Sequence, residues 1–199
     1  SLSAGSWRSP GYLERITRAQ EFLHAGESYE VCLTDTYTAA SEGELYPQLR
    51  SHNPAPYAAH LVFDGVEVCS ASPERFLTVR GREVEAKPIK GTISADQDPA
   101  LLTTDPKTRA ENLMIVDLLR NDLSRVCEPG SVRVPKLMQV ESYVTVHQLV
   151  STITGQLRTG ATAVDALRAA FPPGSMTGAP KLRTCEIIDQ LETGPRGVY

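Results

Sequence analysis

Residues 57–72 read YAAHLVFDGVEVCSAS, and this stretch is the clearest guide to the fold class. Two runs rich in apolar and β-branched residues flank Asp64 and Gly65, a pair that is typical of the tight turn in a β-hairpin. A weaker hairpin pattern follows, in which ERFLTV and REVEA flank Arg80 and Gly81. The sequence therefore predicts a run of antiparallel strands over residues 57–87.

The rest of the chain mixes helical and strand patterns around these hairpins. Ser9 and Pro10 are typical of a helix start and Gly26 of a helix end, with apolar residues at helical spacing between them. No regular alternation of strands and helices follows, so the sequence favours an α+β fold with a largely antiparallel sheet. The other expected elements are strands at 29–38 and within 131–157, and helices at 44–50, 107–126, 162–171 and 180–192.

Three segments are expected to lack regular structure. Proline and glycine in KPIKGT, residues 87–92, predict the end of the preceding strands. Residues 96–106 are polar and contain two prolines, which predicts a surface loop, and residues 172–180 predict a second loop. By contrast, the apolar middle of 107–126 predicts a helix that is buried on most of its sides.

Composition excludes several classes of protein. The chain has 199 residues, 41% hydrophobic and 22% charged, which suits one globular domain or a piece of a larger one. A net charge of −4 argues against nucleic acid as the main partner. No apolar run approaches the roughly 20 residues that span a bilayer, and the first residues do not resemble a signal peptide. Four widely spaced cysteines indicate a reduced intracellular chain.

Two candidate catalytic residues lie near the predicted end of the strands. Lys90 stands between an apolar residue and Gly91, and burial of a lysine favours the neutral amine that a nucleophile needs. Taken alone, this motif is better explained by a surface lysine in a turn, because exposed lysines are far commoner than buried ones. Glu74, in SPERF, could be a general acid if burial favours its protonated form, whereas a salt bridge to a neighbouring arginine is the alternative.

A glycine-rich segment, GSMTGAPK at residues 174–181, leads into the last predicted helix. Backbone N–H groups and a helix N-terminus could bind an anion there. The segment lacks the lysine that directly follows the second glycine of a phosphate-binding P-loop, so a carboxylate is as plausible a ligand as a phosphate. A plain structural turn remains the alternative.

Two further candidates are Glu111 and His147. Carboxylates in the otherwise apolar helix at 107–126 are costly to bury unless they are paired or bind a metal, and oxygen ligands suit magnesium. Besides Glu111, this helix carries Asp117, Asn121 and Asp122. The alternative for Glu111 is stabilisation by the helix dipole. For His147, in a predicted strand with Ser151 on the same face, the alternative is a hydrogen-bonded core residue.

The order and wording of these motifs resemble the chorismate-utilising enzyme family, whose members include anthranilate, aminodeoxychorismate, isochorismate and salicylate synthases. The resemblance rests on GESYEVCLT, SPERF, PIKGT, AENLMIVDLLRND, YVTVHQLVSTITGQL and GSMTGAPKLRTCEIID. It implies an α+β fold in which antiparallel sheets form a sandwich with outer helices and the site lies in a cleft. Anthranilate synthases usually read PIAGT where this chain reads PIKGT, so Lys90 favours the members that aminate chorismate at C4.

The resemblance also implies a role for each matching residue. Lys90 would attack C2 of chorismate and expel the C4 hydroxyl, Glu74 would assist that departure, and ammonia would then displace the lysine. Glu111 would hold Mg²⁺ against a substrate carboxylate. Isochorismate and salicylate synthases carry a water-activating lysine where this chain has Glu30, which disfavours hydration chemistry. The pocket residues implied by the family are Gly91, Thr92, His147, Thr177 and Tyr199.

Two features depart from the family pattern. Pro173 stands where a glycine is usual, and the family continues past the position of Tyr199 with strands, a glycine loop, an arginine and a second magnesium glutamate. The resemblance therefore implies that residues 1–199 are a partial chorismate-binding catalytic domain, without its C-terminal part and catalytically silent alone. The alternatives are an anthranilate synthase component, or a truncated domain that binds chorismate weakly or only contacts an amidotransferase.

The family implies a partner and a location as well. A glutamine amidotransferase, fused or separate, would supply the ammonia, and neither nucleic acid nor a membrane is expected to bind. The expected location is the cytoplasm, or a plastid if the source is a plant.

Overall fold

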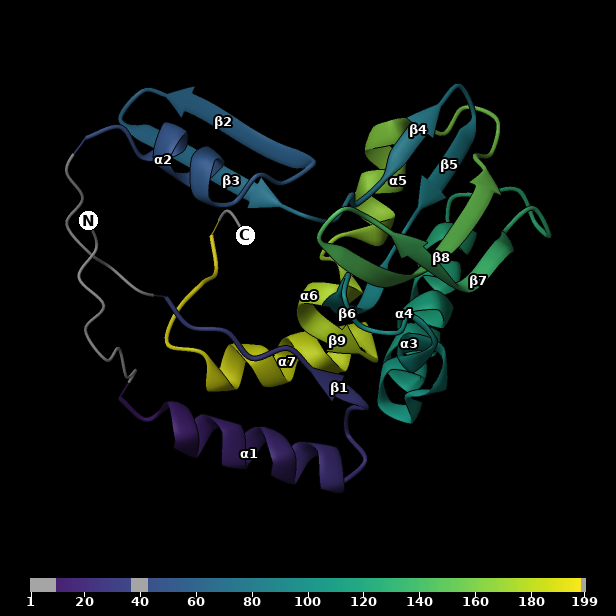
Figure 1. Ribbon diagram of the computed structural model, residues 1–199. Coiled ribbons are helices and arrows are strands. Elements are labelled where there is room, and N and C mark those ends of the chain that lie inside the picture. Colours follow the sequence, from purple (N-terminus) through teal and green to yellow (C-terminus); the bar gives the residue numbers. More distant parts are fainter. Residues whose placement is uncertain (1–9, 37–42, 198–199) are drawn as a thin grey trace.

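A computed structural model of the chain describes residues 10–36 and 43–197 (Figure 1). Its largest sheet has five strands, and all of its pairings are antiparallel. The long strand β8 (Val146–Gln156) lies at the centre, with β7 (Arg133–Ser142) along one edge. The other edge pairs first with β6 (Ile89–Ser94) and then with β5 (Glu83–Ala86), and β5 pairs outward with β4 (Thr78–Arg80).

Two smaller sheets accompany the large one. The hairpin of β2 (Tyr57–Phe63) and β3 (Val66–Ser72) turns at Asp64 and Gly65 and packs against α2 (Leu45–His52). In Figure 1 this unit lies apart from the five-stranded sheet, at the top left. The third sheet joins β1 (Glu30–Val31) to β9 (Gly178–Ala179), which brings together segments about 150 residues apart.

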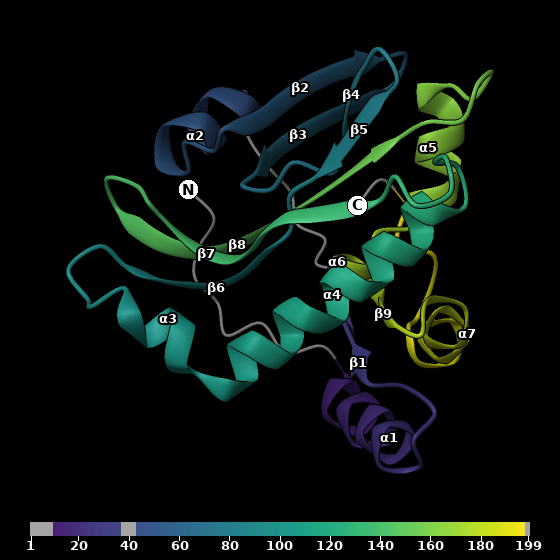
Figure 2. The same cartoon turned by 90° about the vertical axis from the view of Figure 1, so that its right-hand side faces the viewer.

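Helices flank the sheets. The longest, α4 (Pro106–Ser124), crosses one face of β6 and β8, as Figure 2 shows, and is preceded by the short α3 (Ala100–Thr104). Helix α5 (Ala163–Ala170) packs on α4, and the single turn α6 (Gly174–Thr177) leads into β9. Helices α1 (Tyr12–His24) and α7 (Lys181–Leu191) pack side by side.

The main hydrophobic core fills the space between α4 and the sheet. Because side chains alternate along a strand, Leu149, Ser151 and Ile153 of β8 lie on the same face of the sheet. Ser151 donates a hydrogen bond to Asn112 of α4 on this face. A second, smaller core joins α1 to α7. The buried members of the main core are Val84, Ala86, Ile115, Val116, Leu119, Leu123, Cys127, Ile153, Leu157 and Ala166.

The α+β class with antiparallel sheets is confirmed, as are both hairpins and the helices at α2, α4, α5 and α7. The first helix begins later than predicted, with Gly11 at its N-cap position, and Ser9 lies outside the described residues. The strand expected at 29–38 is confined to β1 within the part described, up to residue 36. No described helix combines the length and the apolar character needed to cross a bilayer.

Four expectations were wrong. Residues 87–92 do not end the strands, because β6 begins at Ile89 and pairs with β8. The expected loop at 96–106 contains α3, whose Leu102 is buried. The expected loop at 172–180 contains α6 and β9. Helix α4 is buried on one side only, since Leu113 is 53% exposed.

Candidate active site

Lys90 lies at an irregularity in the pairing of β6 with β8. Ile89 pairs with Val150 and Thr92 pairs with Gln148, so two residues of β6, Lys90 and Gly91, face one residue of β8. Such a β-bulge bends a strand and redirects side chains, and bulges are common beside active sites. The bulge explains why a motif containing glycine remains part of a strand.

The amine of Lys90 pairs with Glu30 of β1. Lys90 Nζ donates a hydrogen bond to Glu30 Oε1 over 3.0 Å, and the two side chains are only 16% and 19% exposed. Within the described residues, the second oxygen, Glu30 Oε2, is buried and has no hydrogen-bond partner. The surface-lysine alternative is therefore wrong, and one oxygen of Glu30 is available to another group.

Glu74 lies close enough to Lys90 for the lysine charge to act on it. Its carboxylate accepts hydrogen bonds of 3.4 Å from the backbone N–H of Ile89 and from the Ser175 hydroxyl. Burial raises the pKa of Glu74, although the Ile89 N–H, the Lys90 charge and the Ser175 hydroxyl oppose this. The salt bridge to a neighbouring arginine is not formed, because Arg75 pairs with Glu85 instead. Glu74 thus has the environment of a proton donor.

The glycine-rich segment positions Glu30 and Ser175. Gly178 has φ of 131°, and a Cβ atom there would lie 1.9 Å from the backbone oxygen of Glu30, so only glycine allows β9 to pair with β1. Thr177 is buried, and its hydroxyl donates to the backbone oxygen of Pro173. Lys181 donates to Asp122, which is 3% exposed, and to Ala170. The segment has a clear structural role, and anion binding by it stays a prediction.

Gly91 and Thr92 lie beside Lys90 in different surroundings. Gly91 has φ of 93°, and a Cβ atom there would lie 2.3 Å from Thr108 Cγ2 on α4. Close packing on the helix therefore explains this glycine without a ligand. Thr92 lines a cleft of about 520 Å³ together with Ile89, Gln148 and Tyr143, and Lys90 is not part of that lining.

His147 is held by hydrogen bonds to both of its ring nitrogens. Nδ1 lies 2.8 Å from Ser142 Oγ, and Nε2 lies 3.1 Å from the backbone oxygen of Ala95. This is the hydrogen-bonded structural role that the sequence left open for it. A role in lining the substrate pocket stays a prediction.

Glu111 lies about one turn along α4 from Thr108, the residue that contacts Gly91. Its carboxylate is 32% exposed, and among the described residues it makes a single ion pair, of 3.9 Å, with Lys107, whose side chain is 83% exposed. A weakly held carboxylate of this kind fits Mg²⁺, which takes one or two carboxylates and keeps several waters. No group of three potential metal ligands among the described residues includes Glu111.

The structure thus brings Lys90, Glu30, Glu74 and Ser175 together from four separate segments. The sequence indicated Lys90 and Glu74 but predicted neither the partnership with Glu30 nor the contact with Ser175. A charged residue within the apolar strand pattern YEVCL was the one available signal for Glu30. Tyr199 lies outside the described residues.

Comparison with known proteins identifies the family. Residues 3–199 match the family model described as chorismate binding enzyme. The chain belongs to this family. It is 52% identical to a probable chloroplastic aminodeoxychorismate synthase of Oryza sativa and 48% identical to aminodeoxychorismate synthase component 1 of Klebsiella aerogenes, each over 94% of the chain.

A solved structure has the same fold. The crystal structure of anthranilate synthase component I from Streptococcus pneumoniae matches with a TM-score of 0.83, at 37% identity over 94% of this chain. The chain spans 23% of the length of the rice protein, 44% of the Klebsiella protein and 43% of the Streptococcus chain. It therefore corresponds to less than half of each of these relatives.

Proposed function

We propose that this chain supplies the catalytic residues for converting chorismate and ammonia into 4-amino-4-deoxychorismate, a precursor of 4-aminobenzoate and folate. The observation that carries the proposal is the partly buried amine of Lys90, placed on a β-bulge beside Glu30 and Glu74. The names of the rice and Klebsiella relatives support it, since both are aminodeoxychorismate synthases.

The proposed reaction has two substitutions. The neutral amine of Lys90 forms a bond to C2 of chorismate, the ring double bonds shift, and the C4 hydroxyl leaves as water with a proton from Glu74. Ammonia then forms a bond to C4, the double bonds shift back, and the bond between C2 and Lys90 breaks. Glu30 accepts the proton that the Lys90 ammonium must lose before the first step. The net change is exchange of the hydroxyl for an amino group with release of water.

Further parts of the proposal concern the metal and the partner. Glu111 would hold Mg²⁺, which would bind a carboxylate of chorismate. Gly91, Thr92, His147, Thr177 and Tyr199 remain the proposed pocket residues. The name "component 1" of the Klebsiella relative supports a second component, which we propose to be a glutamine amidotransferase. We expect the reaction in the cytoplasm, or in a plastid in a plant, as the chloroplastic rice relative suggests.

A hybrid enzyme tests the assignment of Lys90. This chain would replace the matching segment of the Klebsiella protein, to which it is 48% identical, and the products from chorismate, Mg²⁺ and ammonium would be separated by chromatography. The hybrid should form aminodeoxychorismate, and Lys90→Ala should reduce that rate by at least about 100-fold, because covalent attack is lost. Incubation with chorismate but no ammonia should add mass to the peptide that contains Lys90.

Lys136→Ala is the matched control, since that lysine is exposed on β7 and lies outside the proposed site. Wild-type turnover by the Lys90→Ala hybrid would show that Lys90 is not the nucleophile. The second candidate function is anthranilate synthesis, which the similarity to the Streptococcus structure favours. If the unaltered hybrid forms anthranilate in place of aminodeoxychorismate, the proposed function is wrong and anthranilate synthesis is the function.

A further inference from the structure

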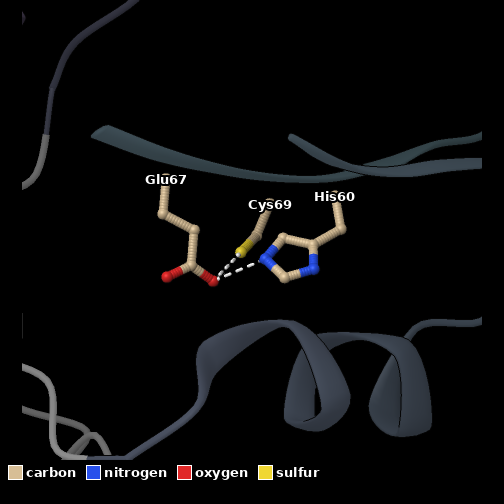
Figure 3. Close-up of side chains that lie close together, drawn as sticks. All are labelled: His60, Glu67 and Cys69. Carbon is tan, nitrogen blue, oxygen red and sulfur yellow. Dashed lines mark hydrogen bonds and ion pairs between the residues drawn. The ribbon is translucent and has the colours of Figure 1, made fainter. Parts of the chain in front are cut away.

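A second group of chemically reactive side chains lies on the hairpin of β2 and β3, away from the residues assigned to chorismate. His60 pairs directly with Cys69 across the hairpin, and Glu67 pairs with Val62 two positions further on. Since side chains of one strand alternate between faces, His60, Glu67 and Cys69 must project from the same face. Figure 3 shows the three side chains converging there.

Their polar atoms are close together. His60 Nε2 lies 2.7 Å from Glu67 Oε1, and Cys69 Sγ donates to the same oxygen over 3.4 Å. All three potential ligand atoms lie within 4.8 Å of one another, and no other group of three or more histidine, cysteine, aspartate or glutamate side chains is so arranged in residues 10–36 and 43–197. The cluster combines nitrogen, sulfur and oxygen donors at one point.

We propose that His60, Glu67 and Cys69 bind a zinc ion, with water in the fourth position. Imidazole nitrogen, thiolate sulfur and carboxylate oxygen are the zinc ligands of proteins, and three of them with one open position form a familiar tetrahedral site. Bond lengths of about 2.0–2.3 Å place tetrahedral ligand atoms roughly 3.3–3.7 Å apart. The His60–Glu67 contact must therefore lengthen by less than about 1 Å, which rotation of the Glu67 side chain provides.

The surroundings favour binding. The rings of Tyr46 on α2 and His60 stack with centroids 4.7 Å apart and an interplanar angle of 11°, which holds the imidazole in place. The side chains of His60 and Glu67 are 37% and 51% exposed, so an ion can reach the cluster directly from solvent. An isolated two-stranded hairpin is marginally stable in water. Zinc held by one ligand from β2 and two from β3 would cross-link the hairpin.

Cobalt substitution tests the site on the 199-residue chain. We expect one Co²⁺ per chain, an absorption band from charge transfer between thiolate and Co²⁺, and displacement of Co²⁺ by Zn²⁺. Cys69→Ser should abolish the band. His60→Asn should weaken Co²⁺ binding by at least about 100-fold, because loss of an outer partner of a metal ligand alone costs about 10–100-fold. Cys185→Ser, which alters a half-buried cysteine on α7, is the matched control and should leave the band unchanged.

A measurement on the unaltered chain tests the site even if the variants fail to fold. Zinc should slow alkylation of Cys69 by at least about tenfold relative to Cys185, as followed by mass spectrometry of the peptides. Absence of a thiolate band at one equivalent of Co²⁺ would overturn the proposal. So would a band that persists in Cys69→Ser, or equal alkylation of Cys69 with and without zinc.

Discussion

Two carboxylates approach the amine of Lys90, and their surroundings suit them to different tasks. Glu30 holds the amine by a 3.0 Å hydrogen bond and keeps its other oxygen buried without a partner in the described part of the chain. Glu74 is partly buried, which raises its pKa and favours the protonated form. In the proposed reaction Glu30 accepts the proton of the amine and Glu74 gives one to the departing hydroxyl. The different surroundings of Glu30 and Glu74 thus suit one carboxylate to accept a proton and the other to donate one.

The raised pKa of Glu74 predicts how stability depends on pH. A carboxyl whose pKa is raised on folding stabilises the fold fully below its unfolded pKa, and this stabilisation is lost as pH rises through the folded value. Glu74→Gln does not ionise. The melting temperature of Glu74→Gln minus that of the wild type should therefore increase as the pH rises above the ordinary glutamate pKa of about 4.3. Thermal unfolding followed by circular dichroism at several pH values measures this difference.

Glu83→Gln is the control, because Glu83 is an exposed strand residue and its substitution should give a smaller change with pH. In the hybrid enzyme, Glu74→Gln should also lower turnover by at least about 100-fold, the usual contribution of a general acid. A melting difference that is constant with pH would show that burial does not raise the pKa of Glu74.

At the scale of the element, the contact of the β6 bulge with α4 positions Lys90. Gly91 has φ of 93°, and its Cα faces Thr108 so closely that a methyl group would lie 2.3 Å from Thr108 Cγ2 and 3.0 Å from Leu102 Cδ2. The helix N-terminus is itself fixed, because the Asp105 side chain accepts a hydrogen bond from the backbone N–H of Thr108. The close contact between Gly91 and Thr108 therefore fixes the position of the β6 bulge relative to the N-terminus of α4.

Gly91→Ala should destabilise the fold by about 2–5 kcal/mol. A left-handed backbone costs a residue with a Cβ atom about 1–2 kcal/mol, and an extra methyl group in a packed site costs about 1–3 kcal/mol. Adding Thr108→Ser removes Cγ2 and should recover most of the packing cost, but not the backbone cost. Urea unfolding of the single and double variants measures both contributions.

Gly130→Ala separates the two costs. Gly130 has φ of 73°, and a Cβ atom there would have nothing within 4 Å, so this variant reports the backbone cost alone. If Gly91→Ala is no more destabilising than Gly130→Ala, the close packing of β6 on α4 is not what requires the glycine.

The same elements show which parts of the fold the sequence could predict. The hairpin at 57–72 was predicted because its turn residues and strand pattern are local signals. Strand β6 was missed because Lys90 and Gly91 form a bulge within it, and in the sequence a glycine after a proline-containing motif looks like the end of a strand. Helix α3 was missed because Leu102, buried among distant residues, stabilises a segment of only five residues. Short elements held by tertiary packing leave little trace in the local sequence.

At the scale of the whole molecule, the candidate site exists only through contacts between distant segments. Glu30 reaches Lys90 because β1 pairs with β9, and Ser175 reaches Glu74 from the turn that precedes β9. Strand alternation and helix periodicity act over a few residues and contain no information about such pairings. The resemblance to the family indicated Lys90 and Glu74 individually, whereas their arrangement around one amine required the structure.

The hairpin of β2 and β3 also has consequences for the molecule as a whole, because its two faces differ. The face opposite His60 carries Leu61, Phe63 and Val66, which are 48%, 61% and 55% exposed. Within the described residues this sheet has two strands, so each also has an unpaired edge. Exposed apolar patches and open edges both favour association. The 199-residue chain is therefore expected to self-associate through this face as its concentration rises.

Phe63→Lys should weaken that association by at least about tenfold. Burial of a phenylalanine side chain contributes about 1.5–3 kcal/mol, and about 1.4 kcal/mol corresponds to a tenfold change in an equilibrium constant. Val62→Lys is the matched control, since Val62 is 70% exposed but lies on the face of His60 and Glu67. Sedimentation equilibrium over a range of concentrations measures the association constant of each variant. Equal weakening by the two lysine substitutions would mean that the apolar face does not direct the association, because charge alone would then account for the effect.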